Sequence, residues 1–216
     1  MRVLCLVFVS IFVFGCAAPT IMVEVPNIEK SSSMDLVDLR PQSEKENKIF
    51  SLSITSEAYG TYRRGDKLLD PSMVRIFQHR VFEKYAELED VPEVKLHHFV
   101  VYMNLKSELR RGVTGGLLGG VVGAAVASGT QKYGIDGLAS ITTTEEFNAF
   151  EKEYKRALYT EEENPDKVSV FKVYLEAEID GKRIFIETMT PTKLPDNKNP
   201  HVAAVETAIA YFLDQY

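Results

Sequence analysis

The stretch that decides the fold is residues 169–189, which read Ser-Val-Phe-Lys-Val-Tyr-Leu-Glu-Ala-Glu-Ile-Asp-Gly-Lys-Arg-Ile-Phe-Ile-Glu-Thr-Met. Apolar side chains occupy every second position from Phe171 to Ile179, which is the period of a strand with one buried face. The dipeptide Asp180-Gly181 that follows is typical of a two-residue hairpin turn. The sequence therefore predicts an antiparallel hairpin with strands at 168–179 and 183–189.

Two further strands and three helices are predicted around this hairpin. Residues 48–55 and 94–105 are rich in β-branched and aromatic side chains, which favour strands. Helices are expected at 71–88, 145–159 and 200–215, because apolar residues recur there at helical intervals after a capping residue. The helix starts are marked by Asp70-Pro71, by the capping-box sequence Thr143-Thr144-Glu145-Glu146 and by Asn199-Pro200. We expect an α/β (α+β) domain with a small, mainly antiparallel sheet covered by two to three helices.

The first sixteen residues indicate export. A basic start, Met1-Arg2, precedes an apolar run at 3–14, and Val13-Phe14-Gly15-Cys16 has the pattern of a lipobox. A run of about a dozen apolar residues is too short to span a bilayer and fits a signal-peptide core. We expect residues 1–15 to be the signal peptide and Cys16 to receive acyl chains such as palmitate, which anchor the protein in the membrane; no other cofactor is expected. The alternative is an uncleaved N-terminal anchor helix.

Composition narrows the class of partner. The chain has 31 acidic and 25 basic residues, a net charge of −6, which argues against nucleic acid as a partner. Cys5 leaves with the signal and Cys16 carries the lipid, so no disulfide is expected in an oxidising envelope. Ala17 favours sorting to the outer membrane, facing the periplasm, by analogy with enteric bacteria. Residues 16–47 contain several prolines and no sustained period, which predicts a lipidated tether before a domain at 48–216.

Residues 112–131 are 20 consecutive residues without a charge. Small residues recur there every four positions, at Gly115, Gly119, Gly123 and Ala127 and in an adjacent row that begins with Gly116 and Gly120. This spacing bares one face of a helix, so that a second helix can approach closely. It predicts a glycine zipper, inserted in the domain, that contacts a membrane or another copy of the chain. Two alternatives stay open: a flexible or buried apolar loop, because glycine weakens isolated helices, and a phosphate-binding loop, which lacks the usual Gly-Lys-Ser/Thr.

The four histidines do not form the pattern of a metal-binding site. His97 and His98 are adjacent on a predicted strand, so we expect them on opposite faces, and no spaced third ligand accompanies them. His79 and His201 stand alone on the predicted helices or their caps. We therefore expect no metal site.

No catalytic arrangement is predicted either. Arg63 and Arg64 fall, with Tyr59 and Tyr62, in a polar turn region at 59–67, where they could meet a sugar or phosphate group, although exposed loop arginines are common. The acidic run Glu161 to Glu163 lacks the glycine-containing Asp-rich loop of a calcium site. No Ser/His/Asp or Cys/His set can be assembled, so we expect a protein that is not an enzyme.

Several short motifs follow one another in a family-like order. They are Gly15-Cys16-Ala17, Val23-Glu24-Val25, Asp70-Pro71-Ser72, Val81-Phe82-Glu83-Lys84, Val94-Lys95-Leu96 and Gly181-Lys182, before a terminal helix. In this order the chain resembles the YajG-type family of small enterobacterial lipoproteins over most of its mature length. It departs from that family by inserting residues 112–131 and the helix at 145–159. The resemblance implies a periplasm-facing lipoprotein without known chemistry, and it supplies no catalytic residues.

These features predict a non-enzymatic outer-membrane lipoprotein that faces the periplasm. It would act as a structural or assembly component of an envelope complex and self-associate through the zipper, as a homo-oligomer or with envelope proteins. The alternative is a membrane-active lipoprotein whose zipper inserts in the bilayer as an oligomer. A third class is a hydrolase of peptidoglycan or another glycan, for which the sequence shows no nucleophile or acid pair.

Overall fold

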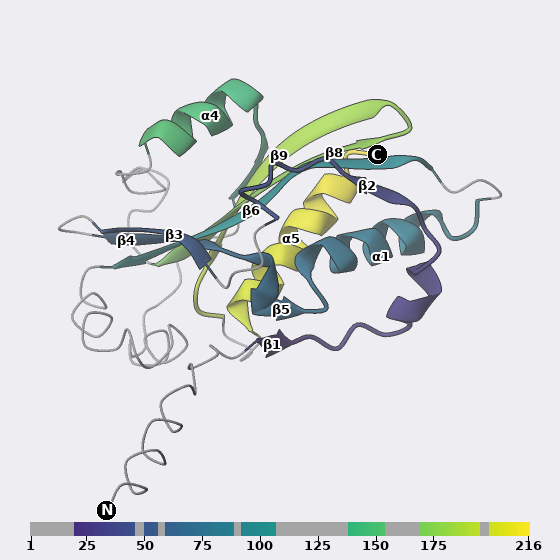
Figure 1. Cartoon of the computed structure of the whole chain (residues 1–216), viewed down its shortest axis with the longest axis horizontal. Helices are drawn as coiled ribbons and strands as arrows, with labels where there is room; N and C mark the ends of the chain where they lie inside the picture. The colour runs from purple at the N-terminus through teal and green to yellow at the C-terminus, as the bar shows by residue number, and fades with distance from the viewer. Residues whose placement is uncertain are drawn as a thin grey trace, which may run out of the picture.

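A computed structural model describes residues 20–45, 50–55, 59–88, 92–106, 138–153, 169–194 and 199–216. Within these residues, three α-helices pack on a mixed, mostly antiparallel sheet (Figure 1). Helices α1 (Met73–Tyr85) and α5 (Pro200–Leu213) cover one face of the sheet, and α4 (Thr144–Glu153) lies over the other. The expected α/β fold class is confirmed.

Six strands follow one another across the sheet, each antiparallel to the next. In spatial order they are β3 (Phe50–Thr55), β4 (Tyr59–Arg64), β6 (Val94–Lys106), β8 (Val170–Ile179), β9 (Lys182–Pro191) and β7 (Leu138–Ile141). Three short strands and two 3-10 helices complete the described chain: β1 (Ile21–Met22), β2 (Leu36–Asp38), β5 (Leu69–Asp70), η1 (Ile28–Ser31) and η2 (Asp66–Leu68). β2 runs parallel to β6 and β1 runs parallel to β5.

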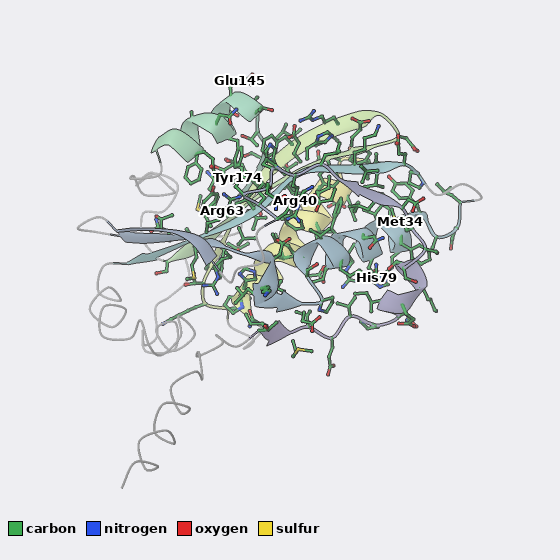
Figure 2. The ribbon with its side chains drawn as sticks, in the orientation of Figure 1. Met34, Arg40, Arg63, His79, Glu145 and Tyr174 are labelled. Atoms are coloured by element: carbon green, nitrogen blue, oxygen red, sulfur yellow. The ribbon has the colours of Figure 1, made fainter. Side chains whose placement is uncertain are left out.

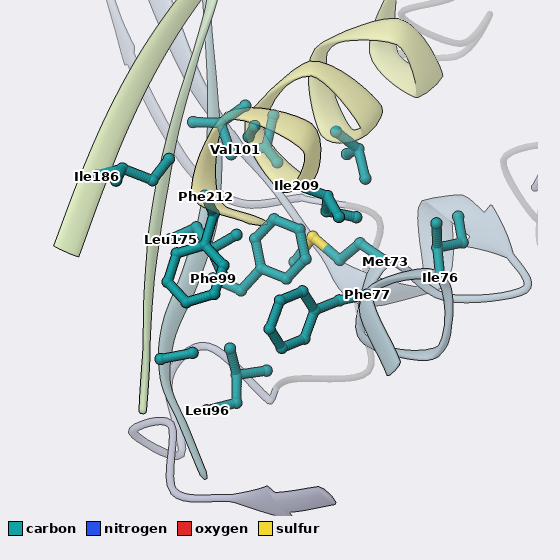
Figure 3. Close-up of a cluster of buried hydrophobic side chains, with 14 of the residues drawn as sticks. Met73, Ile76, Phe77, Leu96, Phe99, Val101, Leu175, Ile186, Ile209 and Phe212 are labelled. Carbon is teal, nitrogen blue, oxygen red and sulfur yellow. The ribbon is translucent and has the colours of Figure 1, made fainter. Parts of the chain in front are cut away.

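The β8–β9 hairpin is confirmed as the organising element. Asp180 and Gly181 have φ of 48° and 78°, the left-handed backbone that a tight hairpin turn needs, and Gly181 adopts it without a Cβ penalty. Odd-numbered residues of β8 face α1 and α5, and even-numbered ones face α4. On the α5 side, Phe77 meets Phe99 and Phe212 edge-on, with ring centroids 6.2 and 5.6 Å apart (Figure 3). This aromatic cluster is the centre of the main core.

Two of the three predicted helix starts are confirmed and one is corrected. Asn199 Oδ1 accepts hydrogen bonds from the first amides of α5, and Pro200 begins that helix. At α4, Thr143 and Glu146 form the reciprocal capping box. The α1 start was wrong by two residues: Ser72, rather than Asp70, caps it by accepting a hydrogen bond from Arg75 N at 3.3 Å, and the Asp70-Pro71 peptide is cis.

The expected tether at 16–47 is wrong for residues 20–45, which belong to the folded domain. We call residues 20–38 the N-terminal strap; they contribute β1, η1 and β2, with Ser31 and Met34 buried. The sequence conceals this because each element is two to four residues long, too short to show a period. Their hydrogen bonds are made with distant strands, so only tertiary contacts reveal them.

The predicted turn at 59–67 is also corrected. Residues 59–64 form β4, a strand between β3 and β6, and both of its arginines are buried rather than exposed in a loop.

None of the helices in the described ranges combines the length and apolarity needed to cross a bilayer.

Candidate functional site

The residues singled out for lipidation and helix contact are outside the described part of the chain. They are Cys16 and the zipper positions Gly115, Gly116, Gly119, Gly120, Gly123 and Ala127, so their predicted roles stay predictions. Two other contact systems are well defined: the docking of the N-terminal strap on α1, and a cluster of charged side chains beneath α4. The strap contacts hold the N-terminal part of the described chain on the domain. The charged cluster contains the acidic and basic side chains that have to be considered for binding or catalysis.

The strap docks through backbone carbonyls that α1 side chains bind. His79 is buried, its Nδ1 lies 2.9 Å from Ser31 Oγ and its Nε2 lies 3.0 Å from Pro26 O (Figure 2). Arg75 donates to Ser31 Oγ at 2.8 Å and also to Ile28 O. One side of α1 therefore binds the strap. This explains the role of His79, which the sequence analysis found alone on a predicted helix.

The strap is tied down from its first described residue. Thr20 Oγ1 donates to Lys67 O at 3.2 Å, β1 pairs with β5 from Ile21 opposite Leu69, and Val23 N donates to Asp70 O at 2.8 Å. The first described residue of the folded domain is thus four positions after Cys16 in sequence.

Arg40 locks the other end of the strap. It is 4% exposed and donates to Asp38, just before it, and to Asp66 in η2, with Nη2 to carboxylate distances of 3.0 and 2.7 Å. Burial alone would raise the pKa of Asp38, but the hydrogen bonds and charge of Arg40 outweigh it and lower that pKa. The guanidinium therefore joins β2 to the segment after β4 (Figure 2).

The edge of β6 is shared by two strands, with a gap between them. β2 pairs with Val94 to Leu96, and β4 pairs with Val101 to Lys106. In the gap, the amide of Phe99 donates to Glu44 Oε2 at 3.1 Å, and Glu44 Oε1 lies 2.6 Å from His98 Nδ1. Glu44 thus supplies a partner where the strand edge would otherwise leave a buried amide unbonded.

A β-bulge in β6 overturns the expectation for the histidine pair. The register with β8 shifts between Leu96 and His98, so His97 is an extra residue. Both histidines then approach carboxylates on the α4 side of β8: His97 lies 3.8 Å from Glu178, and His98 lies 3.8 Å from Glu176. They share a face instead of pointing to opposite ones.

His98 is enclosed by rings as well as by carboxylates. Its imidazole stacks on Phe185 at 5.7 Å and tilts against Phe147 of α4 at 4.9 Å. Glu176, 3% exposed, also accepts from Arg183 Nε at 2.8 Å. The series Glu44, His98, Glu176 and Arg183 therefore alternates acid and base across the sheet.

Helix α4 adds one further carboxyl to this cluster. Burial raises the pKa of Glu151, Arg63 opposes that rise and Glu44 adds to it. Glu151 Oε1 is buried and has no hydrogen-bond partner among the described residues. Glu44 and Glu151 both escaped the sequence analysis: the first sat in the expected tether, and the second on a helix whose docking face only the aromatic packing shows.

The cluster binds itself more than it offers groups to a substrate. The imidazole nitrogens of His98 both face carboxylates, and Glu176 accepts from Arg183, so each of these groups already has a neighbour within the cluster. Within the described ranges, no group of three or more His, Cys, Asp or Glu side chains is placed to hold a metal ion. The arrangement is that of an ionic brace between β6, β8 and the segment that carries Glu44.

No family model, curated protein or solved structure matches this chain. Its function is therefore argued from its own residues.

Proposed function

We propose that this chain is a lipid-anchored outer-membrane protein on the periplasmic side, a non-enzymatic structural or assembly component that self-associates through residues 112–131. The lipobox ending at Cys16 supports the anchor, and the spacing of small residues from Gly115 to Ala127 supports the helix contact.

One observation carries the proposal: the domain begins at Thr20, which is hydrogen-bonded to Lys67 and leads directly into β1. Four residues reach at most about 14 Å when fully extended. An acylated Cys16 would therefore hold the domain against the bilayer surface. Such a position suits a protein whose partners are the membrane and other molecules fixed in it.

The charged cluster beneath α4 supports a structural role. His98 and Arg183 are each engaged by carboxylates, and Phe147 and Phe185 cover the imidazole. A general base needs a ring nitrogen within hydrogen-bond reach of the proton that it removes. Here Glu44 already takes Nδ1, and Nε2 faces Glu176.

The test is membrane fractionation of the full chain and of Cys16→Ser, with Cys5→Ser as the matched control because Cys5 lies within the signal. We expect Cys16→Ser to lose incorporation of a fatty-acid analogue and to move from the membrane to the soluble fraction, while Cys5→Ser behaves as wild type. Affinity capture from solubilised envelopes, with and without residues 112–131, then tests association. Retention of unlabelled Cys16→Ser in the membrane would contradict lipid anchoring and favour an uncleaved anchor helix.

A further inference from the structure

Arg64 is a buried cation with no acidic partner among the described residues. It pairs in register with Val101, whose side chain belongs to the core under α1 and α5, so Arg64 lies on that same face of the sheet. Arg64 is 7% exposed, and its Nε and Nη1 have no hydrogen-bond partner among the described residues. Burial lowers the pKa of Arg64 to about 10, so the guanidinium remains charged at neutral pH.

Other arginines of the domain are treated differently. Arg40 binds Asp38 and Asp66, Arg80 binds Glu83 and Glu206, and Arg183 binds Glu176. An isolated charge is costly to bury, and native proteins compensate it with an opposite charge. Unlike these three arginines, Arg64 has no carboxylate partner among the described residues, and unlike Arg75 its Nε and Nη1 have no hydrogen-bond acceptor either, which points to an anion that the chain accommodates at this place.

Further open polar groups lie on the same face. His201, in the first turn of α5, is 3% exposed with Nδ1 unpartnered, and its ring packs edge-on against Phe171. Phe171 lies two residues along β8 from Val173, and Val173 is in the cross-strand row that contains Val101 and Arg64, so the start of this 14-residue helix lies over the same part of the sheet as Arg64. In agreement, the charge of Arg64 contributes to lowering the pKa of His201. The hydroxyls of Thr188 and Thr190 on β9 are also buried without partners within the described ranges.

The strand register places Arg64, Thr188 and Thr190 on the same face of the sheet. Thr188 pairs with Val173 and Thr190 pairs with Phe171, and both partners face α5. Strands β4, β6, β8 and β9 are neighbours, so Arg64 and the two threonines lie about 14 Å apart at the backbone, with the start of α5 between them.

We propose that Arg64, His201 and the start of α5 form a buried binding site for an oxyanion, a carboxylate or phosphate group, with the Thr188 and Thr190 hydroxyls available to the rest of the ligand. A guanidinium fork matches two oxygens of such a group. The partial positive charge of a helix N-terminus favours an anion there and would repel a cation. The proposal does not rest on lipid anchoring, because Arg64, His201 and the two threonines all belong to the folded domain.

The test is thermal unfolding of the detergent-solubilised full chain in sodium phosphate, sodium acetate or sodium chloride at equal ionic strength. Arg64→Met removes the charge and keeps an apolar stem, and Arg80→Met is the matched control at a surface pair. We expect phosphate or acetate to raise the Tm of wild type and Arg80→Met, but not of Arg64→Met. At a concentration about 100 times Kd, the folding equilibrium constant rises about 100-fold. Whichever anion acts identifies the chemistry, and liposomes with phosphatidylglycerol then separate a lipid headgroup from free phosphate.

The sign of the mutation without added anion is equally diagnostic. With its site empty, wild type buries a lone charge, so Arg64→Met should then have the higher Tm. If Arg64→Met is instead less stable in chloride and neither oxyanion changes the wild-type Tm, Arg64 is paired with a carboxylate of this chain and the proposal is overturned. A measurement on wild type alone guards against a variant that does not fold: oxyanion must shift the ¹⁵N resonance of His201 Nδ1, and a resonance that stays fixed also overturns the site.

Discussion

Arg40 shows what a single buried cation contributes when it is paired. Its guanidinium is enclosed and makes hydrogen bonds to Asp38, two residues before it, and to Asp66, 26 residues after it. Removing Arg40 leaves Asp38 and Asp66, two partly buried carboxylates, without the cation that both of them bind, and this loss costs more than the pair itself contributes to stability.

We therefore predict that Arg40→Leu lowers the free energy of unfolding by about 3–5 kcal/mol. Arg80→Leu is the control, because Arg80 also pairs with two carboxylates but is 30% exposed, and a half-exposed pair contributes about 1 kcal/mol or less. Urea unfolding of the two variants measures the difference. Equal losses in both would show that Arg40 is not the lock between β2 and η2.

His201 predicts how stability depends on pH. Burial, and then the charge of Arg64, lower the pKa of His201 to about 3. Between that value and about 6.5 the unfolded chain binds a proton at this position and the folded chain does not. Stability should therefore fall with decreasing pH across this window, by about 1.4 kcal/mol per pH unit.

His201→Gln removes the titrating group and keeps a polar side chain. We expect its curve of unfolding free energy against pH to be flatter than that of wild type by the slope of one proton, measured by urea unfolding from pH 7 to pH 4. Curves that stay parallel would mean that His201 takes up a proton in the folded state.

At the scale of elements, long periodic segments were predictable and short ones were not. The β8–β9 hairpin follows from the alternation after Phe171 and from the Asp180-Gly181 turn, both of which are local properties. β2 has three residues and pairs with a strand 58 positions further along, so nothing local distinguishes it from a tether. The bulge at His97 is equally invisible, because a single inserted residue leaves the composition of the strand unchanged and moves only its register.

The candidate site was predicted less well than the fold. Arg63 and Arg64 were seen in the sequence, but two arginines after Tyr-Gly-Thr-Tyr favour a loop unless something pays for their burial. The groups that the two arginines act on are far away in sequence: Glu151 is 88 residues from Arg63, and His201 is 137 residues from Arg64. Contacts between segments so distant follow from the topology of the sheet and not from local sequence.

The N-terminal strap gives a prediction at the element scale. A chain starting at Thr20 keeps every described contact of the strap, whereas a chain starting at Ser43 loses β1, η1 and β2, with buried Met34 and Arg40. We expect the first to unfold at the wild-type urea midpoint, and the second to have a far lower midpoint or no cooperative transition. Equal midpoints for the two truncated chains would restore the tether interpretation.

At the scale of the whole molecule, the two faces of the sheet differ in character. The α5 side is a continuous apolar core with Arg64 and His201 at one end, and the α4 side mixes the aromatic residues Tyr102, Phe147 and Tyr174 with the ionic brace. In sequence, residues 112–131 fall between β6 and β7, and the proposed association depends on the spacing of their small residues.

Replacing Gly119 and Gly123 by Leu tests that association. Bulky side chains would then occupy the face where two helix backbones should approach, whereas Leu at Val121 and Val122 leaves that face unchanged. We expect chemical crosslinking in membranes to yield fewer oligomers for the glycine pair alone. The same yield from both double variants would reject helix contact and favour an apolar loop.

Under the proposed anchoring, the four-residue separation of Cys16 from Thr20, which is hydrogen-bonded to Lys67, would also determine how the protein meets other molecules. A flexible tether of 30 residues would let the domain explore about 30 Å from its anchor, deep into the surrounding solution. A link of four residues restricts an acylated protein to a thin layer, where it diffuses laterally. Encounters with other anchored molecules then depend on the number of anchored molecules per area of membrane. Their effective concentration in this layer is far above their average concentration in the compartment. A freely diffusing partner has to reach the membrane surface before it can bind.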